Sequence, residues 1–173
     1  MSFEGIWLPL ITPFRDGAVD LPAVRRLVRR YVEAGIHGFV VCGTTGEAAT
    51  LDEAEQLAVL DTVLEAADGR RPVLMGLASN DTREALRLLR GIGQRPLAGL
   101  LTAAPYYSRP SQRGIEAHFR AIAAATAAIT VASTLAVAAI AALAIATGIV
   151  VAVVVITATA IIATAKIERT DAH

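Results

Sequence analysis

Four short apolar runs recur along the first 120 residues at intervals of about thirty residues, and this recurrence limits the possible folds more than any other feature. The runs are Ile6–Leu10, Gly38–Cys42, Pro72–Leu77 and Leu97–Thr102. Continuous apolar runs of this length are typical of strands that are buried on both faces, as in parallel sheets. The intervals between them are expected to hold helices, which gives repeated strand–helix units.

The first two intervals carry helical patterns. Residues 21–34 place an apolar stripe on one face and arginines on the other, and Gly35 is expected to end this helix. The stripe consists of Val24, Leu27, Val28 and Tyr31. A second helix is predicted over residues 50–67, with Thr50 as its N-cap and Glu53 completing a capping box.

Two further helices follow. One is predicted to begin after a cap at Asn80 or Asp81, to run to Arg90 and to end at Gly91. Another is predicted to begin at Ser111.

Repeated strand–helix units form either a doubly wound sheet or a β/α barrel. No G-x-G-x-x-G motif follows the first strand, which argues against a dinucleotide-binding sheet. Polar segments directly follow two strand ends, at Gly43–Glu47 and Pro105–Arg109, and barrel enzymes build their sites at these ends. We therefore predict an α/β fold, a TIM-type (β/α)8 barrel. Such a barrel takes about 250 residues, so 173 residues hold only its first five or six units, as a fragment or an incomplete record of a longer chain.

The composition changes at Arg120. Residues 121–165 contain no charged residue and only Ala, Val, Ile, Leu, Thr, Ser and Gly, an alphabet that is abnormal for a globular segment. Residues 1–120 are expected to form the organised barrel units, and residues 121–173 a low-complexity region of further units with unreliable sequence.

Three interpretations of the low-complexity region stay open. A membrane hairpin needs about 20 apolar residues per span, but the Ala and Thr content and the lack of an aromatic belt argue against it. The region is otherwise a genuine buried βαβ segment, or its letters differ from the natural sequence, since all are small residues of similar shape.

Charge and cysteine content exclude several function classes. Sixteen basic and sixteen acidic residues cancel, so no basic face predicts a nucleic-acid partner. Cys42 is the only cysteine, which rules out an internal disulfide and suits a reducing compartment. The N-terminus lacks a signal peptide pattern, so a cytoplasmic location without a membrane partner is expected. His37 and His118 are interpreted as structural, and no spacing typical of metal ligands is present.

The segment Gly43-Thr44-Thr45-Gly46-Glu47 follows the predicted second strand. Two glycines permit a tight turn with positive φ, in which successive N–H groups and two hydroxyls face one point. Such a nest suits a carboxylate or a phosphate. The alternative is a plain turn with a threonine cap.

The segment Pro105-Tyr106-Tyr107 follows the predicted fourth strand. Paired tyrosines in such a place are often packing or interface residues. A tyrosine hydroxyl also relays protons when a second hydroxyl hydrogen-bonds to it, and Thr44 is the candidate for that second hydroxyl.

Taken together, these motifs resemble the pyruvate-dependent aldolases of the dihydrodipicolinate synthase family. The segments that carry the resemblance are Gly5–Phe14, Gly43–Leu51, Gly76–Thr82, Pro105–Gln112 and His118–Phe119. They occur in the order and at the spacing of that family, and they cover about residues 1–120.

The resemblance implies a lyase of the class I aldolase type, in which a lysine forms a Schiff base with pyruvate and no cofactor is needed. The enamine then attacks aspartate semialdehyde, and the product is a hydroxylated tetrahydrodipicolinate on the route to lysine. Thr44 is implied in a proton relay, and Thr45 with Gly43 in binding the pyruvate carboxylate. Tyr107 is implied to complete the relay in a neighbouring subunit, which predicts a homo-oligomer, a dimer of dimers.

The chain also departs from the family. No tyrosine follows Tyr107, so the fifth-strand tyrosine is missing, and no arginine lies between Arg120 and Arg169. Lys166 is the only lysine and follows an apolar run. It is either the imine-forming nucleophile, with a pKa lowered by desolvation, or a solvated tail residue. Another pyruvate or 2-keto-acid aldolase and a non-catalytic fragment remain the alternative functions.

Overall fold

The computed structural model of the chain describes residues 4–126, 129–132 and 152–153. Six strands form one sheet in the order β1-β4-β5-β6-β7-β8, and every neighbouring pair is parallel. The order follows the chain without a reversal, whereas a doubly wound sheet reverses at a switch point. The winding is therefore that of a barrel wall. The strands are β1 (Trp7–Pro9), β4 (Gly38–Val41), β5 (Val73–Leu77), β6 (Gly99–Thr102), β7 (Ile129–Ala132) and β8 (Ala152–Val153).

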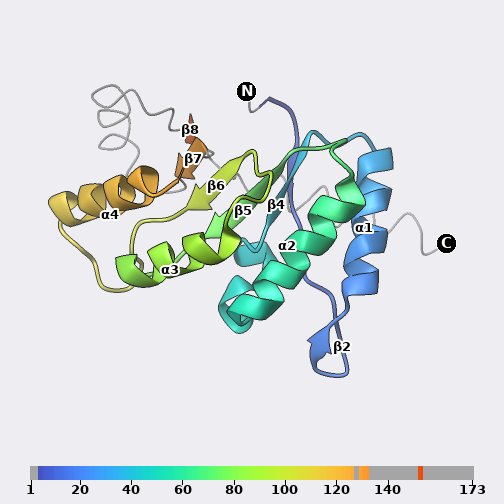
Figure 1. Cartoon of the computed structure of the whole chain (residues 1–173), viewed down its shortest axis with the longest axis horizontal. Helices are drawn as coiled ribbons and strands as arrows, with labels where there is room; N and C mark the ends of the chain where they lie inside the picture. Colours follow the sequence, from blue (N-terminus) through green and yellow to red (C-terminus); the bar gives the residue numbers. More distant parts are fainter. Residues whose placement is uncertain (1–3, 127–128, 133–151, 154–173) are drawn as a thin grey trace.

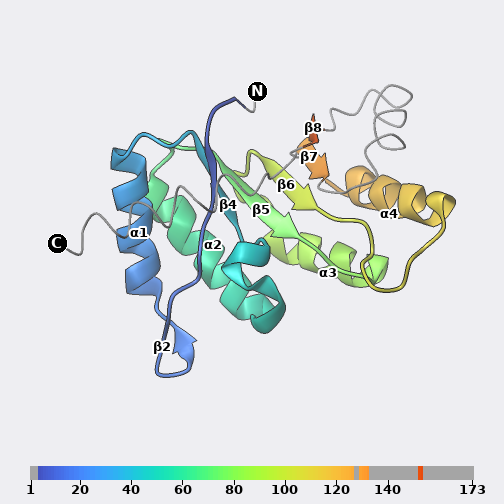
Figure 2. The same cartoon turned by 180° about the vertical axis from the view of Figure 1, so that it is seen from behind.

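Helices connect the strands. They are α1 (Leu21–Glu33), α2 (Glu53–Ala67), α3 (Thr82–Ile92) and α4 (Gln112–Ala124). Figure 1 shows α1, α2 and α3 side by side in front of the sheet, and Figure 2 shows the same strands from behind, with these helices on the far side. Helices on one face are the arrangement of a β/α barrel, whose other face is the barrel interior.

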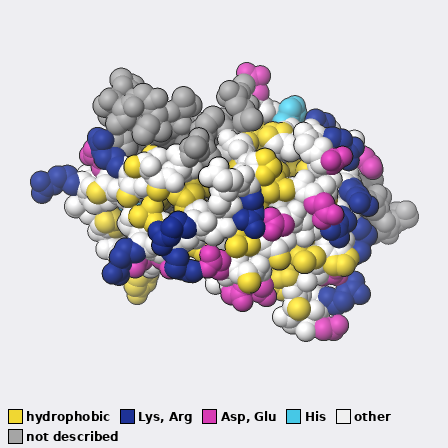
Figure 3. Space-filling model, viewed as in Figure 1, with side chains coloured by type: hydrophobic (Ala, Val, Ile, Leu, Met, Phe, Trp, Pro, Cys, Tyr) yellow, Lys and Arg dark blue, Asp and Glu magenta, His cyan; other side chains and the backbone are white. Residues whose placement is uncertain are grey.

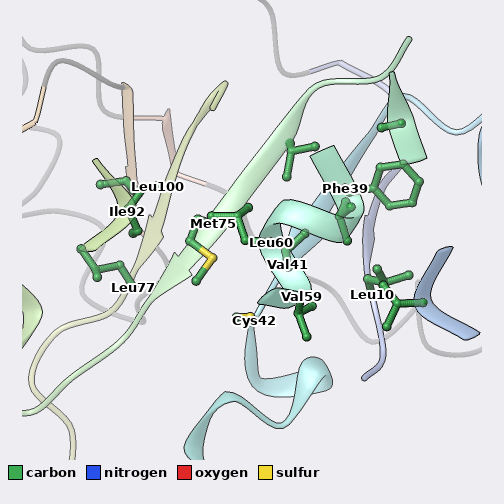
Figure 4. Packing of buried hydrophobic residues seen from close by; sticks show 14 of the residues in the cluster. Leu10, Phe39, Val41, Cys42, Val59, Leu60, Met75, Leu77, Ile92 and Leu100 are labelled. Carbon is green, nitrogen blue, oxygen red and sulfur yellow. The ribbon is translucent and has the colours of Figure 1, made fainter. Parts of the chain in front are cut away.

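The main core lies between the sheet and the helices (Figure 4). Alternate residues of a strand point to opposite faces, and β4, β5 and β6 are buried on both faces, as their continuous apolar runs predicted, whereas β1 is half-buried. Burying each such side chain contributes about 1.5–3 kcal/mol. The helix-facing residues include Phe39, Val41, Met75, Leu77 and Leu100, whereas Val40, Leu74, Ala98 and Leu101 form a second cluster with Trp7.

Helix α1 follows its prediction. The Asp20 carboxylate accepts a hydrogen bond from the Ala23 amide at 2.9 Å, and this bond caps the first turn. Val24, Val28 and Val32 are buried at helical spacing. Gly35 follows the helix with a φ of +83°, which glycine adopts without strain.

The start of α2 was predicted wrongly. Asp52, not Thr50, is the N-cap, and its capping box closes with Glu55 rather than Glu53. The Thr50 hydroxyl instead donates to the Glu47 carbonyl at 2.9 Å. This bond closes a separate turn, so the helix begins only where the next carboxylate can cap it.

The end of α3 also differs from its prediction. Asp81 caps the helix as expected, but Gly91 lies inside it and Gly93, with a φ of +62°, ends it. A Cβ atom on Gly91 would lie 2.3 Å from the Glu53 carboxylate of α2. That carboxylate ends a flexible side chain and can move away, so the contact does not demand a glycine; Gly91 is simply an interior residue of α3 and not its stop signal. Ser111 caps α4 as predicted.

A small hairpin precedes α1 and was not predicted. Its strands, β2 (Phe14–Arg15) and β3 (Ala18–Val19), pair antiparallel. Asp16 and Gly17 form the turn with φ values of 52° and 81°, as in the tight turns typical of Asp-Gly. The hairpin extends away from the body of the molecule (Figure 1).

Acidic and basic side chains alternate over the helical face (Figure 3). Arg25 of α1 pairs with Glu65 of α2 at 2.6 Å, and Arg95 pairs with Asp61 of α2 at 2.6 Å. The first pair joins α1 to α2, and the second joins the segment after α3 to α2, although exposed ion pairs each contribute only about 0–1 kcal/mol. Within the part of the chain that the structure describes, no helix has the length and apolarity that a membrane span requires.

Candidate active site

The two predicted site segments lie after the carboxyl ends of β4 and β6. The first begins at Gly43 and forms two short turns, η1 (Thr44–Gly46) and η2 (Ala48–Thr50). The second occupies the connection between β6 and α4. Because the strands are parallel and β5 lies between β4 and β6, both segments belong to the same end of the barrel wall.

The β4 loop, which we define as residues 43–51, is held by contacts from several elements. The Thr12 hydroxyl donates to the Gly46 carbonyl at 2.7 Å in a buried hydrogen bond. The Gln56 side-chain amide of α2 donates to the Ala48 and Leu51 carbonyls at 3.1 and 3.2 Å. These bonds fix the loop against the segment after β1 and against α2.

Glycines allow close backbone approach around this loop. A Cβ on Gly46 would lie 2.9 Å from the Leu10 carbonyl oxygen, and one on Gly76 of β5 would lie 2.1 Å from the Cys42 carbonyl oxygen. Neither distance is possible for a real side chain, so the loop packs on β1 and β5 only because both positions are glycine.

The expectation of positive φ at the loop glycines was wrong. Gly43 has a φ of −79°, and the left-handed residues are Cys42 at 52° and Glu47 at 54°. The amides of Gly46 and Glu47 donate to Gly43 and Thr44 at 3.0 and 3.1 Å, so they are not available to a ligand.

The loop leaves hydrogen-bonding groups of two threonines without partners among the described residues. The side chains of Thr44 and Thr45 are exposed. Their amides lie in the first turn of η1, where N–H groups lack internal acceptors, and no described residue accepts from them. Two hydroxyls and two amides of neighbouring residues are therefore unpaired within the described part of the chain.

Cys42, which directly precedes the loop, is not a nucleophile in this environment. Its side chain is buried, and burial raises the pKa of the thiol to about 12. The thiol therefore stays protonated at neutral pH, and the thiolate is the reactive form.

The β6–α4 connection, of which we call residues 103–110 the tyrosine loop, carries the two tyrosines. Tyr106 is 52% exposed and Tyr107 is 97% exposed, with a φ of 69°. The Ser108 amide donates to the Tyr106 carbonyl at 2.8 Å. The Tyr107 side chain therefore extends into solvent.

His118, interpreted as structural from the sequence, lies at the contact between α3 and α4. Its side chain is buried in α4, and its Nδ1 lies 2.8 Å from the Thr82 hydroxyl of α3. Burial lowers the pKa of His118 from its ordinary value, and the backbone of Ala103 raises it by less. The imidazole is therefore neutral at physiological pH.

The structure brings together some of the predicted site residues. Gly43, Thr44 and Thr45 share one turn. Tyr107 lies two strands away, and no hydrogen bond joins it to Thr44 among the described residues. Lys166 lies outside the described residues.

The described residues form no metal-binding group, and a cavity in the structure lies away from the predicted site residues. No group of three or more His, Cys, Asp or Glu side chains suited to a metal occurs within residues 4–126. A cavity of about 460 Å³ lies between the ends of α3 and α4, with Arg90, Arg95 and Leu100 in its lining. None of the predicted site residues lines it.

One-directional parallel winding, helices on one face and a polar loop at the strand ends define the chain as part of a β/α-barrel protein. The sequence model of the Dihydrodipicolinate synthetase family matches residues 2–155. The chain belongs to this family, and the predicted resemblance and fold are confirmed. The match extends beyond Arg120, into the low-complexity region.

Curated relatives carry the name 4-hydroxy-tetrahydrodipicolinate synthase. The protein of Pelobacter propionicus is 48% identical over 121 residues, which are 70% of this chain and 42% of the relative. The protein of Sphingopyxis alaskensis is 48% identical over 124 residues, 72% of this chain and 43% of the relative. The chain thus spans less than half the length of these relatives.

Solved structures agree with the fold. The 4-hydroxy-tetrahydrodipicolinate synthase of Methylacidiphilum fumariolicum superimposes with a TM-score of 0.82 at 32% identity, over 86% of this chain and 52% of that structure. The dihydrodipicolinate synthase of Aquifex aeolicus gives a TM-score of 0.74 at 35% identity, over 77% of this chain and 45% of that structure.

Proposed function

We propose that this chain carries the pyruvate-binding part of an enzyme that condenses pyruvate with aspartate semialdehyde. The observation that carries the proposal is the β4 loop at the strand ends, where the exposed Thr44 and Thr45 have hydroxyls and amides without partners among the described residues. Hydrogen bonds to a charged carboxylate contribute about 1.5–3 kcal/mol each. Family membership and the names of the relatives support the choice of a keto acid as the ligand.

The proposed chemistry uses a lysine imine in place of a cofactor. The lysine amine adds to the pyruvate carbonyl, water leaves, and the methyl group of the imine loses a proton. The resulting enamine carbon attacks the aldehyde carbon of aspartate semialdehyde, and the aldehyde oxygen becomes a hydroxyl. Thr45 and Gly43 hold the carboxylate in this scheme, Thr44 and Tyr107 move protons, and Lys166 is the proposed nucleophile.

Tyr107 leads to a proposal about assembly. Its 97% exposed side chain reaches into the site of a neighbouring subunit, so the active protein is a homo-oligomer, a dimer of dimers. One solved relative, with a TM-score of 0.73, is described as a monomeric dihydrodipicolinate synthase variant. Assembly therefore needs direct measurement by sedimentation. The proposed role in lysine biosynthesis places the enzyme in the cytoplasm.

The central experiment is to trap the imine. The protein is incubated with pyruvate and borohydride, and the modified peptide is identified by mass spectrometry. Labelling of Lys166 supports the scheme and the nucleophile together. Labelling of a peptide that does not occur in this sequence supports the activity and shows that residues 121–165 differ from the natural chain.

Two controls define the alternatives. Intact mass compares the chain with its expected 18.1 kDa and detects a longer natural protein. If folded protein at saturating pyruvate forms no adduct, the proposal fails and the chain is a non-catalytic fragment. If the adduct forms but aspartate semialdehyde is not consumed, the enzyme is an aldolase for another aldehyde.

A further inference from the structure

His37 lies where the segment before β1 joins the sheet, in the connection between α1 and β4. Its imidazole Nδ1 accepts a hydrogen bond from the Ile6 amide at 2.9 Å, and its own amide donates to the Ile6 carbonyl at 2.9 Å. One residue therefore holds both backbone polar groups of Ile6. Both residues are exposed, so water competes for the bond between the ring and the amide.

The imidazole takes the place of a backbone acceptor in the β1–β4 ladder. The two strands are parallel with Trp7 opposite Gly38, and the Leu10 amide donates to the Val40 carbonyl at 2.9 Å. Bonds of this kind recur every second residue along a strand. Four residues before Leu10, the Ile6 amide would accordingly face the carbonyl four residues before Val40.

That carbonyl belongs to Ile36, which is not yet part of a strand. The Ile36 amide still bonds back to the Tyr31 carbonyl of α1 at 3.4 Å, and β4 begins only at Gly38. The Ile6 carbonyl follows the ladder, because it also accepts from the Gly38 amide at 3.3 Å. The side chain of His37 thus extends the ladder by one bond beyond the start of β4.

The ring also lies directly against the backbone of Gly5. A Cβ atom on Gly5 would lie 2.3 Å from the His37 Cγ and Nδ1 atoms, and Gly5 has a φ of +79°. The absence of a side chain at Gly5 lets the ring approach the chain closely enough to reach the next amide. The imidazole therefore contacts two successive residues of the segment before β1.

The hydrogen bond determines where the ring carries its proton. A nitrogen accepts an N–H group only through a free lone pair, so Nδ1 is unprotonated and the neutral ring has its proton on Nε2. The proton that makes the ring cationic must then add to Nδ1. Two N–H groups would face each other, and the bond from Ile6 would be lost.

Charged side chains on the neighbouring elements do not engage the ring. Within the described part of the chain, no hydrogen bond or ion pair joins the His37 imidazole to a charged side chain of the N-terminal segment, the end of α1 or the α2–β5 connection. These charged residues are Glu4, Arg30, Glu33, Asp68, Arg70 and Arg71. The Ile6 amide is therefore the group whose contact with the ring changes when the ring gains a proton.

We propose that the His37 imidazole is an acid-sensitive bond of the sheet ladder, which holds the segment before β1 when neutral and releases the Ile6 amide when protonated. Histidine is the side chain whose charge ordinarily changes between about pH 8 and pH 5. The release is local, because the Ile6 carbonyl keeps its two donors and the Leu10 amide keeps its backbone acceptor.

The test is nuclear magnetic resonance on the full, isotope-labelled chain. Nitrogen spectra of the histidine rings give the tautomer, and the neutral His37 ring should carry its proton on Nε2. Exchange of the Ile6 amide with water, relative to an unstructured amide at the same pH, reports the opening of its hydrogen bond. The Leu10 amide is the internal reference, because its acceptor is a backbone carbonyl that does not titrate.

We expect the protection of the Ile6 amide to fall about tenfold between about pH 8 and pH 5, the effect of losing one hydrogen bond of ordinary strength, while Leu10 keeps its protection. In His37→Asn the side-chain oxygen can take the place of Nδ1 and does not titrate, so protection should stay high throughout. His37→Leu has no acceptor and should give low protection at both pH values. The matched control, His118→Gln, removes the other histidine of the described residues and should keep the wild-type response.

Four results would overturn the proposal. They are a neutral His37 ring with its proton on Nδ1, constant protection of Ile6 in the wild type, an acid response in His37→Asn equal to that of the wild type, and an equal loss of protection at Leu10, which indicates general unfolding. If His37→Leu does not fold, the wild type and His37→Asn still decide the question. No step of this test uses pyruvate, so its outcome is independent of the function proposed above.

Discussion

The loops that follow β4 and β6 are built in opposite ways. The β4 loop receives a buried hydrogen bond from Thr12 and two from Gln56, and it packs on two glycine positions. The tyrosine loop has a single internal backbone bond among the described residues and exposes both tyrosines. The β4 loop is therefore held along its length by hydrogen bonds from other elements, whereas the tyrosine loop is held mainly at its two ends.

This difference separates two tasks of a binding site. Groups that hold a ligand need a rigid support, because each degree of misplacement weakens a hydrogen bond. A side chain that completes a neighbouring subunit's site must instead extend from its own subunit. The β4 loop fits the first task and Tyr107 fits the second, as the proposed function requires.

The largest effect is expected where the β4 loop packs on β5. In Gly76→Ala the new methyl group overlaps the Cys42 carbonyl oxygen, a backbone atom that cannot rotate away. We expect a loss of about 3 kcal/mol in the free energy of unfolding, measured by urea denaturation. Gly43→Ala is the control, because its nearest neighbour, Val40, lies 3.7 Å away. Equal stability of the two variants would contradict the packing argument.

The tyrosine loop should show the reverse behaviour, a large effect on rate with none on stability. Tyr107→Phe removes a hydroxyl from a side chain that is 97% exposed, so the free energy of unfolding should not change. Turnover should fall by about 10²-fold, the usual contribution of a proton relay. Tyr106→Phe serves as the control and should keep the wild-type rate. If Tyr107→Phe keeps the wild-type rate, Tyr107 does not relay protons and is only a contact residue.

Thr45→Val tests whether the β4 loop binds the carboxylate. The substitution keeps the shape of an exposed side chain and removes one hydroxyl. Pyruvate binding, measured by calorimetry, should weaken by about 1.5–3 kcal/mol, and Thr45→Ser should recover most of it. Unchanged affinity would show that the segment is only a turn.

Thr12→Val tests the support of the β4 loop rather than its ligand. The Gly46 carbonyl would lose its buried donor, which should lower the free energy of unfolding by about 1.5 kcal/mol. Thr50→Val removes an exposed hydroxyl bond to Glu47 and should change stability by less than about 0.5 kcal/mol. Similar losses in both variants would contradict the distinction between buried and exposed support.

The smallest effect is a pH dependence from His118 beside the tyrosine loop. Its pKa is lowered in the folded chain, so the unfolded chain binds the proton more readily. Stability should therefore fall as the pH drops below the ordinary histidine pKa of about 6.5, and should not change from this residue above it. Urea titrations at several pH values should show this slope in the wild type and a smaller one in His118→Gln.

Local patterns predicted much of the fold. The apolar run Gly38–Cys42 agrees with β4 to within a residue. Of the stripe predicted for α1, Val24 and Val28 are buried and Leu27 and Tyr31 pack against the core partly buried. Such predictions succeed because apolar residues recur with the period of the helix or strand face that is buried. The predicted helix boundary was wrong where two residues could serve as the N-cap, as at Thr50 and Asp52. The choice between them depends on which hydrogen-bond partner the folded chain brings near.

The sequence by itself determined the family, the order of the strand–helix units and the place of the threonine segment after β4. Only the tertiary structure decided that Gly46 and Gly76 serve close packing, and that Cys42 and Glu47 take the left-handed backbone. It also decided that Tyr107 extends outward and that His118 meets Thr82. The physical reason is that short-range periodicity encodes burial, whereas these features arise from contacts between residues that are distant in the chain and meet only when the sheet has formed.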